Sequence, residues 1–326
     1  MIVLRRHVLR LAGGAAALPL FTRASWAQGY PARPVRVIVP VGPGGQSDTA
    51  TRLVAQKLSE NLKQQFYVEN LAGAGGNIGM GAAARAPGDG YTILAAGGSF
   101  VVNPTLYARI PYDPIRDFAP VSLLCASPHV LAVHPSVPAD TLQAFVALAK
   151  ANPGKFSYGS AGVGTPAHLA GELFTLAFGV DITHVPFGGG GPAVVSTLGG
   201  HTPLVFSALP TAAPHVKAGA IRALGMMSAA RSSVLPDVPT MAEMGTPGLE
   251  AVVATGFLVR AGTPREVVDL LHREIVKVLA PAEARERLAA LGFDTVGGTP
   301  EEFAAWIATE IPKWGKVVRG ANIRVQ

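Results

Sequence analysis

Apolar runs alternate with helix-like segments along this chain, and the alternation predicts strands that are followed by helices. Residues 35–40 form an apolar run rich in β-branched residues, which is typical of a buried strand. A turn of glycine and proline follows, and Leu53, Val54 and Leu58 then recur on one side of a helix predicted over 48–63. We expect that helix to start near Ser47, whose hydroxyl can accept a bond from an amide of the first turn.

The same order of strand, turn and helix returns several times. It predicts an α/β fold with mainly parallel sheets and helices on both faces. Further strands are predicted over 66–69, 91–96, 121–126, 130–133, 156–160, 182–185, 204–206, 221–227 and 252–259. Further helices are predicted over 79–85, 141–151, 167–178, 193–198, 264–279, 282–291 and 300–318.

Two breaks in this order predict two lobes. A loop-like segment over 106–118 leads into consecutive strands, and the strand and helix order restarts near residue 156. We expect residues 28–124 and 227–326 to form lobe 1 and residues 125–226 to form lobe 2. The last helix carries Phe303, Trp306 and Ile307 at amphipathic spacing, so it should dock onto lobe 1. Two crossings between lobes imply a hinged clamp.

Glycine-rich turns follow five of the predicted strands. Glycines expose backbone amides, and a helix that starts beside them favours an anion. An isolated Gly-Gly pair is better explained as a tight turn, but its recurrence favours one anion site at the carboxyl ends of the strands. The five turns cover residues 44–45, 73–79, 97–99, 159–165 and 188–191.

Composition and charge narrow the class of protein. The chain has 326 residues, of which 49% are hydrophobic and 15% charged, so it folds around a sizeable core. Its formal charge is +6, but four of these charges (Arg5, Arg6, Arg10 and Arg23) lie in the first 27 residues, which contain no acid. The remaining +2 gives no indication of nucleic-acid binding.

Residues 1–27 are predicted to be an export signal. A basic start precedes an apolar run over 11–21, and Ser25-Trp26-Ala27 fits a cleavage site. The Arg5-Arg6 pair resembles a twin-arginine signal, with Sec export as the alternative. We therefore expect a mature protein that begins near Gln28 and resides in the periplasm. The single cysteine, Cys125, lies in an apolar run and should be a small buried hydrophobe.

Ordered motifs over nearly the whole mature chain resemble the substrate-binding proteins of tripartite tricarboxylate transporters, the Bug family. They include the opening 30–40, the turn Gly44-Gly45 with Asp48, and Gly73-Ala74-Gly75-Gly76-Asn77-Ile78-Gly79. The others cover 68–70, 87–92, 103–104, 112–113, 117–121, 149–155, 168–172, 184–186, 235–240, 262–264 and 299–303.

The resemblance implies a two-lobed periplasmic binding protein fold of type II that works as a hinged clamp. It also implies a small carboxylate ligand, delivery to the membrane permease subunits of a tripartite tricarboxylate transporter, and no chemistry on the ligand. No cofactor, metal or nucleic acid is expected, and we expect a monomer. Di- and tricarboxylates and aromatic carboxylates all fit the pattern.

Four places depart from the family pattern. Val41 stands where an aromatic residue is common, and Phe187 with the following glycines replaces a Tyr-Lys-Gly type sequence. Ser207 replaces a frequent Asp after Phe206, and residues 254–256 lack the usual Trp. These changes remove charged and polar groups, which disfavours an amino-acid ligand such as aspartate.

One ligand carboxylate is expected to lie against the glycine turns, with serine and threonine side chains closing on it from the other lobe. For several of these residues a structural role competes. Thr165 can cap a helix, His168 can support its loop, and Asn77 can bond its own turn. Asp48 is better explained as a partner of Arg52 four residues on. The predicted ligand-binding residues are Gly44, Gly45, Gln46, Ser47, Asn77, Gly98, Ser99, Ser160, Gly164, Thr165, His168, Gly189 and Ser207.

Two other functions remain as alternatives. An exported serine hydrolase would use Ser160, but Tyr158 occupies the place of the glycine that a nucleophile elbow requires. Ile78 breaks the dinucleotide fingerprint, and the eight histidines form no HExxH motif, so no catalytic residue is predicted. A receptor that reports its ligand to a signalling partner fits the sequence as well as a transport protein does.

Overall fold

The computed structural model describes residues 29–43, 46–290 and 292–323. The chain divides into a short unit, Met1–Ala32, and a large unit, Arg33–Gln326, which contains all the elements below. The predicted export signal and the predicted site residues Gly44 and Gly45 lie outside the described residues. No helix within the described part is both long and apolar enough to cross a membrane.

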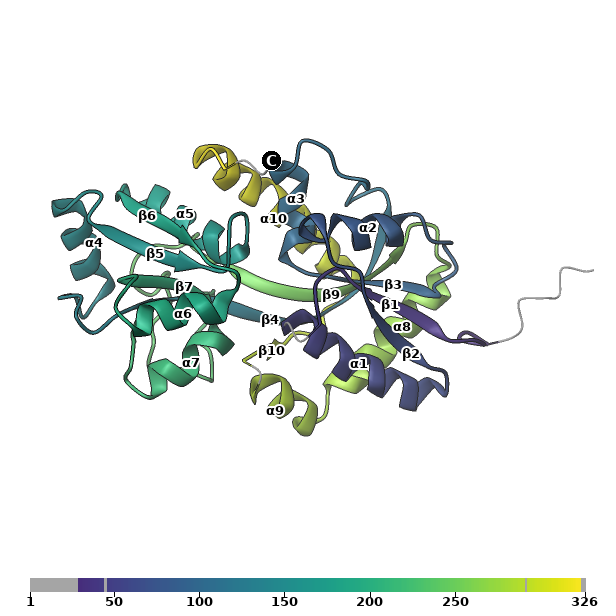
Figure 1. Cartoon of the computed structure of the whole chain (residues 1–326). Coiled ribbons are helices and arrows are strands. Elements are labelled where there is room, and N and C mark those ends of the chain that lie inside the picture. The colour runs from purple at the N-terminus through teal and green to yellow at the C-terminus, as the bar shows by residue number, and fades with distance from the viewer. Residues whose placement is uncertain (1–28, 44–45, 291, 324–326) are drawn as a thin grey trace, which may run out of the picture. The chain divides into compact units, whose positions relative to one another are not determined.

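Ten strands of the large unit form one sheet. The main order is β2-β1-β3-β9-β4-β7-β5-β6, and both β8 and β10 pair with β4. Strand β4 therefore lies in the middle of the sheet and connects its two halves (Figure 1). The strands are β1 Val35–Val39, β2 Phe66–Asn70, β3 Thr92–Ala96, β4 Phe118–Val133, β5 Phe156–Ser160, β6 Ile182–Pro186, β7 Leu204–Ala208, β8 Arg222–Met227, β9 Val252–Arg260 and β10 Asp294–Thr295.

Helices cover the sheet on both faces, as the alternation of strands and helices predicts. Successive residues of β4 show this, because Leu131 and Val133 join one buried core while Val130 and Ala132 join another. The helices are α1 Gln46–Leu62, the short η2 Ala74–Gly76, α2 Asn77–Ala84, α3 Gly98–Leu106, α4 Leu142–Ala151, α5 Pro166–Phe178, α6 Gly190–Leu198, α7 Leu209–Lys217, α8 Arg265–Leu279, α9 Ala282–Ala290 and α10 Pro300–Gly320.

Parallel pairing is confined to the strands that alternate with helices. Strand β1 pairs in parallel with β2 and β3, and β5 pairs in parallel with β6 and β7. The pairs of β4 with its neighbours and of β3 with β9 are antiparallel. The two parallel sets therefore lie at the two ends of the sheet, joined by antiparallel strands. The predicted lobe boundaries at 124/125 and 226/227 stay a prediction.

Strand β4 is longer than the sequence predicts. The expected strands 121–126 and 130–133 are one continuous strand that passes through Pro128. Proline has no amide hydrogen for a sheet ladder, but Pro128 stands where pairing with β9 ends and pairing with β7 and β8 begins at His129. A proline is tolerated at this exchange of partners, so it does not break the strand.

Helix α10 docks onto α3, in the predicted lobe 1, and also onto α5, in the predicted lobe 2. It also packs on β4. Its Phe303 is buried against Gly256 of β9, where a side chain larger than hydrogen would overlap the ring. The absence of a side chain at Gly256 thus allows the helix to lie close to the sheet.

We predict that Gly256→Ala lowers the free energy of unfolding by about 1–3 kcal/mol, because the added methyl overpacks the Phe303 ring. Urea unfolding followed by circular dichroism measures the change. Gly191→Ala on α6 is the matched control, since no atom outside its own neighbourhood lies within 4 Å of the new methyl. Equal stability of both variants and the parent chain would contradict this packing.

Candidate functional site

A cavity of about 430 Å³, hereafter the cleft, lies where β1, β2, β3 and β5 end. Most of its wall comes from the turns that follow these strands and from the starts of the next helices. The residues that line it are Pro40, Val41, Gly42, Ser47, Ala72, Gly73, Gly75, Gly76, Ala95, Gly97, Gly98, Ser99, Asn103, Leu106, Tyr107, Val163, Gly164, Thr165, Pro166 and Val253.

Helices α1, α3 and α5 are among those that begin at the cleft, and Gly76 of its wall is the N-cap of α2. Ser47 belongs to the first turn of α1, Gly98 and Ser99 open α3, and Thr165 precedes α5 as its N-cap. The first amides of a helix have no partner within it, and the helix dipole places partial positive charge there. The cleft is therefore a favourable place for a negatively charged group.

The described lining residues include no charged side chain. Their polar groups are the hydroxyls of Ser47, Ser99, Tyr107 and Thr165 and the amide of Asn103. Hydroxyls can donate hydrogen bonds to an anion without adding a counter-charge. The Thr165 hydroxyl and the Asn103 amide already donate within the protein, to Gly162 and to Gly75 and Asn77 respectively. With no Asp or Glu among them, the described lining residues offer no partner to an ammonium group.

The start of α1 is held by an internal ion pair. Asp48 is buried, and its Oδ2 accepts from Arg52 Nε at 2.9 Å while its Oδ1 accepts from Asn70 Nδ2 at 2.8 Å. Asn70 Nδ2 also donates to the carbonyl of Val41 at 3.0 Å, which ties the turn after β1 to the end of β2. The interpretation of Asp48 as a partner of Arg52 is confirmed, and this carboxylate faces the protein instead of the cleft.

The start of α2 is held by a second network. Asn103 Nδ2 on α3 donates to the carbonyl of Gly75 and to Asn77 Oδ1, both at 2.9 Å. Gly75 has φ +64°, and a methyl there would lie 2.5 Å from Tyr107 Oη. Asn77 is buried beneath the cleft and braces its turn, so the structure supports the structural role for this residue.

The turn before α5 is held by Thr165 and His168. The Thr165 hydroxyl donates to the carbonyl of Gly162 at 2.7 Å and accepts from the His168 amide, which caps α5. The Gly164 amide donates to His168 Nδ1 at 3.0 Å. Thr165 thus caps the helix and also lines the cleft, whereas His168 supports the loop from behind.

The predicted site residues separate into two groups in the described structure. Ser47, Gly98, Ser99, Gly164 and Thr165 line the cleft. Five others lie away from its wall: Asn77, Ser160, His168, Gly189 and Ser207. Gln46 is the first residue of α1. Direct ligand contact by any of them stays a prediction.

Ser160 and Ser207 show why some predicted serines are not on the wall. Ser160 is fully buried, with His184 Nε2 at 2.6 Å from its Oγ and the Gly162 amide donating to the same oxygen at 3.1 Å. Ser207 is buried, and its hydroxyl donates to the carbonyl of Ala208 at 3.3 Å. Both hydroxyls already have partners inside the protein.

Sequence reasoning missed the apolar part of the wall. Leu106 and Tyr107 come from the end of α3, Val163 from the turn after β5, and Val253 from β9. No local signal identifies Val253, because its place at the cleft depends on the position of β9 between β3 and β4, and Val253 itself pairs with Ser127 of β4. Tyr107 follows a helix that the sequence pattern does not predict.

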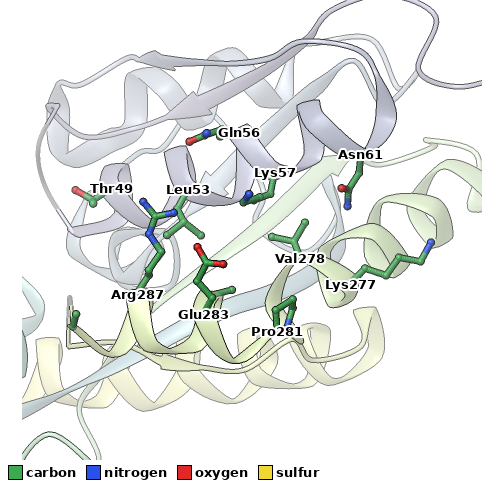
Figure 2. A pocket seen from close by; sticks show the side chains of 12 residues that line it. Thr49, Leu53, Gln56, Lys57, Asn61, Lys277, Val278, Pro281, Glu283 and Arg287 are labelled. Carbon is green, nitrogen blue, oxygen red and sulfur yellow. The ribbon is translucent and has the colours of Figure 1, made fainter.

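A second cavity of about 580 Å³ lies between the side of α1 and the helices α8 and α9 (Figure 2). Its wall carries charged side chains. Two of them form ion pairs with neighbouring residues, Lys57 with Glu60 and Lys277 with Glu274. Among the described residues no glycine lines it, and one helix, α9, begins at its wall. Its lining residues are Thr49, Leu53, Gln56, Lys57, Asn61, Lys277, Val278, Pro281, Glu283, Ala284, Arg287 and Ala290. We therefore place the candidate site in the cleft.

Cys125 is buried, and burial raises the pKa of its thiol to about 12. The predicted role of a small buried hydrophobe is confirmed. Its strand partners are Thr255 on β9 and Thr295 on β10. A thiol with this pKa is a poor nucleophile at neutral pH.

Comparisons with known proteins agree with this geometry. Residues 50–323 match the family model described as tripartite tricarboxylate transporter family receptor. Protein BugT of Bordetella pertussis (strain Tohama I) is 40% identical over 301 residues, which cover 91% of this chain and 92% of BugT.

Two solved structures with bound ligands are also similar. R. palustris Rpa4515 with adipate is 33% identical with a TM-score of 0.79, and the match covers 90% of this chain and 99% of that one. MatC (Rpa3494) from Rhodopseudomonas palustris with bound malate is 31% identical with a TM-score of 0.75, covering 89% and 100%.

We predict that Ser47→Ala lowers the free energy of unfolding by about 1–3 kcal/mol. The reason is that Thr255 Oγ1, on a fully buried residue of β9, donates to Ser47 Oγ at 2.9 Å and would lose this acceptor. The double variant Ser47→Ala/Thr255→Val removes the donor as well and should recover most of the loss in urea unfolding. If the double variant is no more stable than Ser47→Ala, the bond does not hold α1 to β9.

Proposed function

Because the chain belongs to the tripartite tricarboxylate transporter receptor family, we propose that it captures a small carboxylate in the cleft and delivers it to the permease of such a transporter. The observation that carries the proposal is the start of three helices at a cavity whose described wall has no charged side chain. Such a cavity favours an anion by backbone amides and hydroxyls alone.

Hydrogen bonds from uncharged donors are strong enough to bind a carboxylate. A hydrogen bond to a charged group contributes about 1.5–3 kcal/mol, and a helix start adds about 0.3–1 kcal/mol. Donors on α1 and α3 can act together on one carboxylate, and the dipole of α5 adds to their field. Bridging waters can complete its remaining contacts at little free energy.

The size and character of the cleft support a small dicarboxylate as the ligand. Its volume of about 430 Å³ suits a molecule of few heavy atoms. Apolar side chains of Val41, Leu106, Val163 and Val253 can contact the methylene groups between two carboxylates. The similar proteins with adipate and malate bind ligands of this kind. Aspartate is disfavoured because its ammonium group would meet no carboxylate on the described wall.

Both ends of the sheet contribute to the cleft, which supports a clamp. A methyl on Gly98 of α3 would lie 2.9 Å from Pro166 Cγ of α5, and one on Gly164 would lie 2.6 Å from a δ carbon of Leu106. A ligand that contacts both ends stabilises the closed arrangement, because only that arrangement provides all the donors.

The remaining parts of the proposal concern the cellular role. We expect the mature protein to act as a monomer in the periplasm, exported by its first 27 residues, and to release its ligand chemically unchanged. Ser160 and His184 resemble part of a hydrolase site, but the serine hydroxyl is buried and lies away from the cleft wall. A role in transport is therefore favoured over hydrolysis.

The proposal predicts that dicarboxylates raise the melting temperature of the purified mature protein. A ligand at a hundred times its dissociation constant adds about 2.7 kcal/mol to the free energy of unfolding. A thermal-shift screen should therefore identify adipate, malate or a related acid, and calorimetry then gives the affinity. Stabilisation by uncharged sugars or by cations, with none by carboxylates, would refute the proposal.

Closure across the cleft predicts the effect of Gly98→Ala. In the described arrangement, which we propose is the closed clamp, the methyl would press on Pro166 Cγ, so carboxylate affinity should fall about tenfold while an open ligand-free protein keeps its melting temperature. Pro166→Ala removes the opposing atom, so the double variant should regain affinity in the same calorimetric titration. Full affinity of Gly98→Ala alone would show that this contact does not form on binding.

A further inference from the structure

A compact group of polar side chains lies directly behind the turn 162–165. His168 on α5 stacks on His184 of β6, with ring centroids 3.8 Å apart and an angle of 16° between the planes. Glu172 Oε1 lies 3.6 Å from His168 Nε2 and accepts from the Tyr158 hydroxyl at 2.6 Å. His168 is buried, although the turn in front of it forms part of the cleft wall.

Hydrogen bonding fixes the protonation of His168. The Gly164 amide donates to Nδ1 at 3.0 Å, so Nδ1 must carry a lone pair and the single proton of the neutral ring must be on Nε2, toward Glu172. A proton on Nδ1 would place two donors against each other. The Gly164 amide would then have to leave this position.

The surroundings keep both rings neutral near pH 7. Burial, and to a smaller extent the adjacent His184, lowers the pKa of His168 to about 4, and burial lowers the pKa of His184 to about 4. The titratable groups that face His168 are His184 on β6, Tyr158 on β5 and Glu172 on α5 itself. Burial raises the pKa of Glu172. In the described part, β7 and α10 also pack on α5 but form no ion pair with His168.

The position of Gly164 matters because residues from the two halves of the sheet face each other at this turn. Gly164 has φ +74°, and its Cα faces the side chain of Leu106 from α3. The neighbouring Pro166 faces Gly98 across the same gap. A shift of this turn would therefore change the width of the cleft and the direction of its amides.

We propose that His168 is a positioning residue for carboxylate binding, because its unprotonated Nδ1 holds the Gly164 amide and with it the wall of the cleft. The inference rests on the proposed function, since it assigns a role in the same site. It also gives the sign of a pH effect. The affinity for the fully ionised ligand should be constant from pH 8 to about pH 5.5 and should fall below about pH 5, where protonation of His168 releases the turn.

Two substitutions test the hydrogen-bond acceptor and the aromatic ring of His168 separately. Asn at position 168 can place its carbonyl oxygen where Nδ1 lies, and it does not titrate in this range. Phe keeps the flat ring for stacking on His184 but has no acceptor. We expect His168→Asn to bind adipate within about threefold of the parent at pH 7.5, and His168→Phe to bind about tenfold more weakly.

Calorimetric titration of adipate at pH 7.5 and pH 4.5 tests the inference. Protonation of adipate itself is common to all variants, so it cancels when each variant is compared with the parent at the same pH. The parent should lose more affinity on acidification than His168→Asn does. Equal affinity of His168→Phe and the parent at pH 7.5, or equal acid sensitivity of His168→Asn and the parent, would overturn the inference.

A second readout needs no ligand. The amide proton and nitrogen resonances of Gly164 should shift between pH 6 and pH 4 in the ligand-free parent and stay constant in His168→Asn. This result would support the role of His168 in holding the turn even if adipate did not bind, an outcome that would count against the proposed function alone. A Gly164 resonance that does not respond to pH or to His168→Phe would overturn the inference.

Discussion

A carboxylate bound without a counter-charge must be held by peptide dipoles, and this constraint organises the whole molecule. Peptide dipoles act over short distances, so the amides must be aimed at one point before the ligand arrives. The amides are directed at one point where neighbouring strands end side by side and the helices that follow them begin. The two parallel sets of strands, one at each end of the sheet, bring such starts to the cleft from both sides.

Three of the turns at the cleft are each held from behind by a different side-chain network. Asp48, Arg52 and Asn70 hold the start of α1, Asn103 and Asn77 hold the turn before α2, and His168 holds the turn before α5. The charges of Asp48 and Arg52 neutralise one another, and neither residue lines the cleft. We therefore expect the field that acts on a bound ligand to come from the backbone.

The sequence allowed much of the fold to be predicted, because most strands and helices carry a clear periodicity. Helices α3 and α7 escaped prediction since each contains an internal proline, Pro104 and Pro214, and α3 begins in glycine. The glycine turns before α3 and α5 lie at strand ends as predicted, while Gly44 and Gly45 before α1 lie outside the described residues. Which way a side chain points at such an end depends on the neighbouring strand: Ser160 turns toward His184, and only tertiary packing decides this. Val253 reaches the cleft through long-range pairing, which no local pattern encodes.

The single thiol has a practical consequence. Cys125 is buried in β4, and the raised pKa of its thiol makes it unreactive toward alkylating reagents. The folded chain therefore behaves as if it had no cysteine. A cysteine engineered on the exposed rim, for instance at Val163, would be the sole site for an environment-sensitive dye. The native scaffold is thus already suited to conversion into a fluorescent biosensor without removal of background thiols.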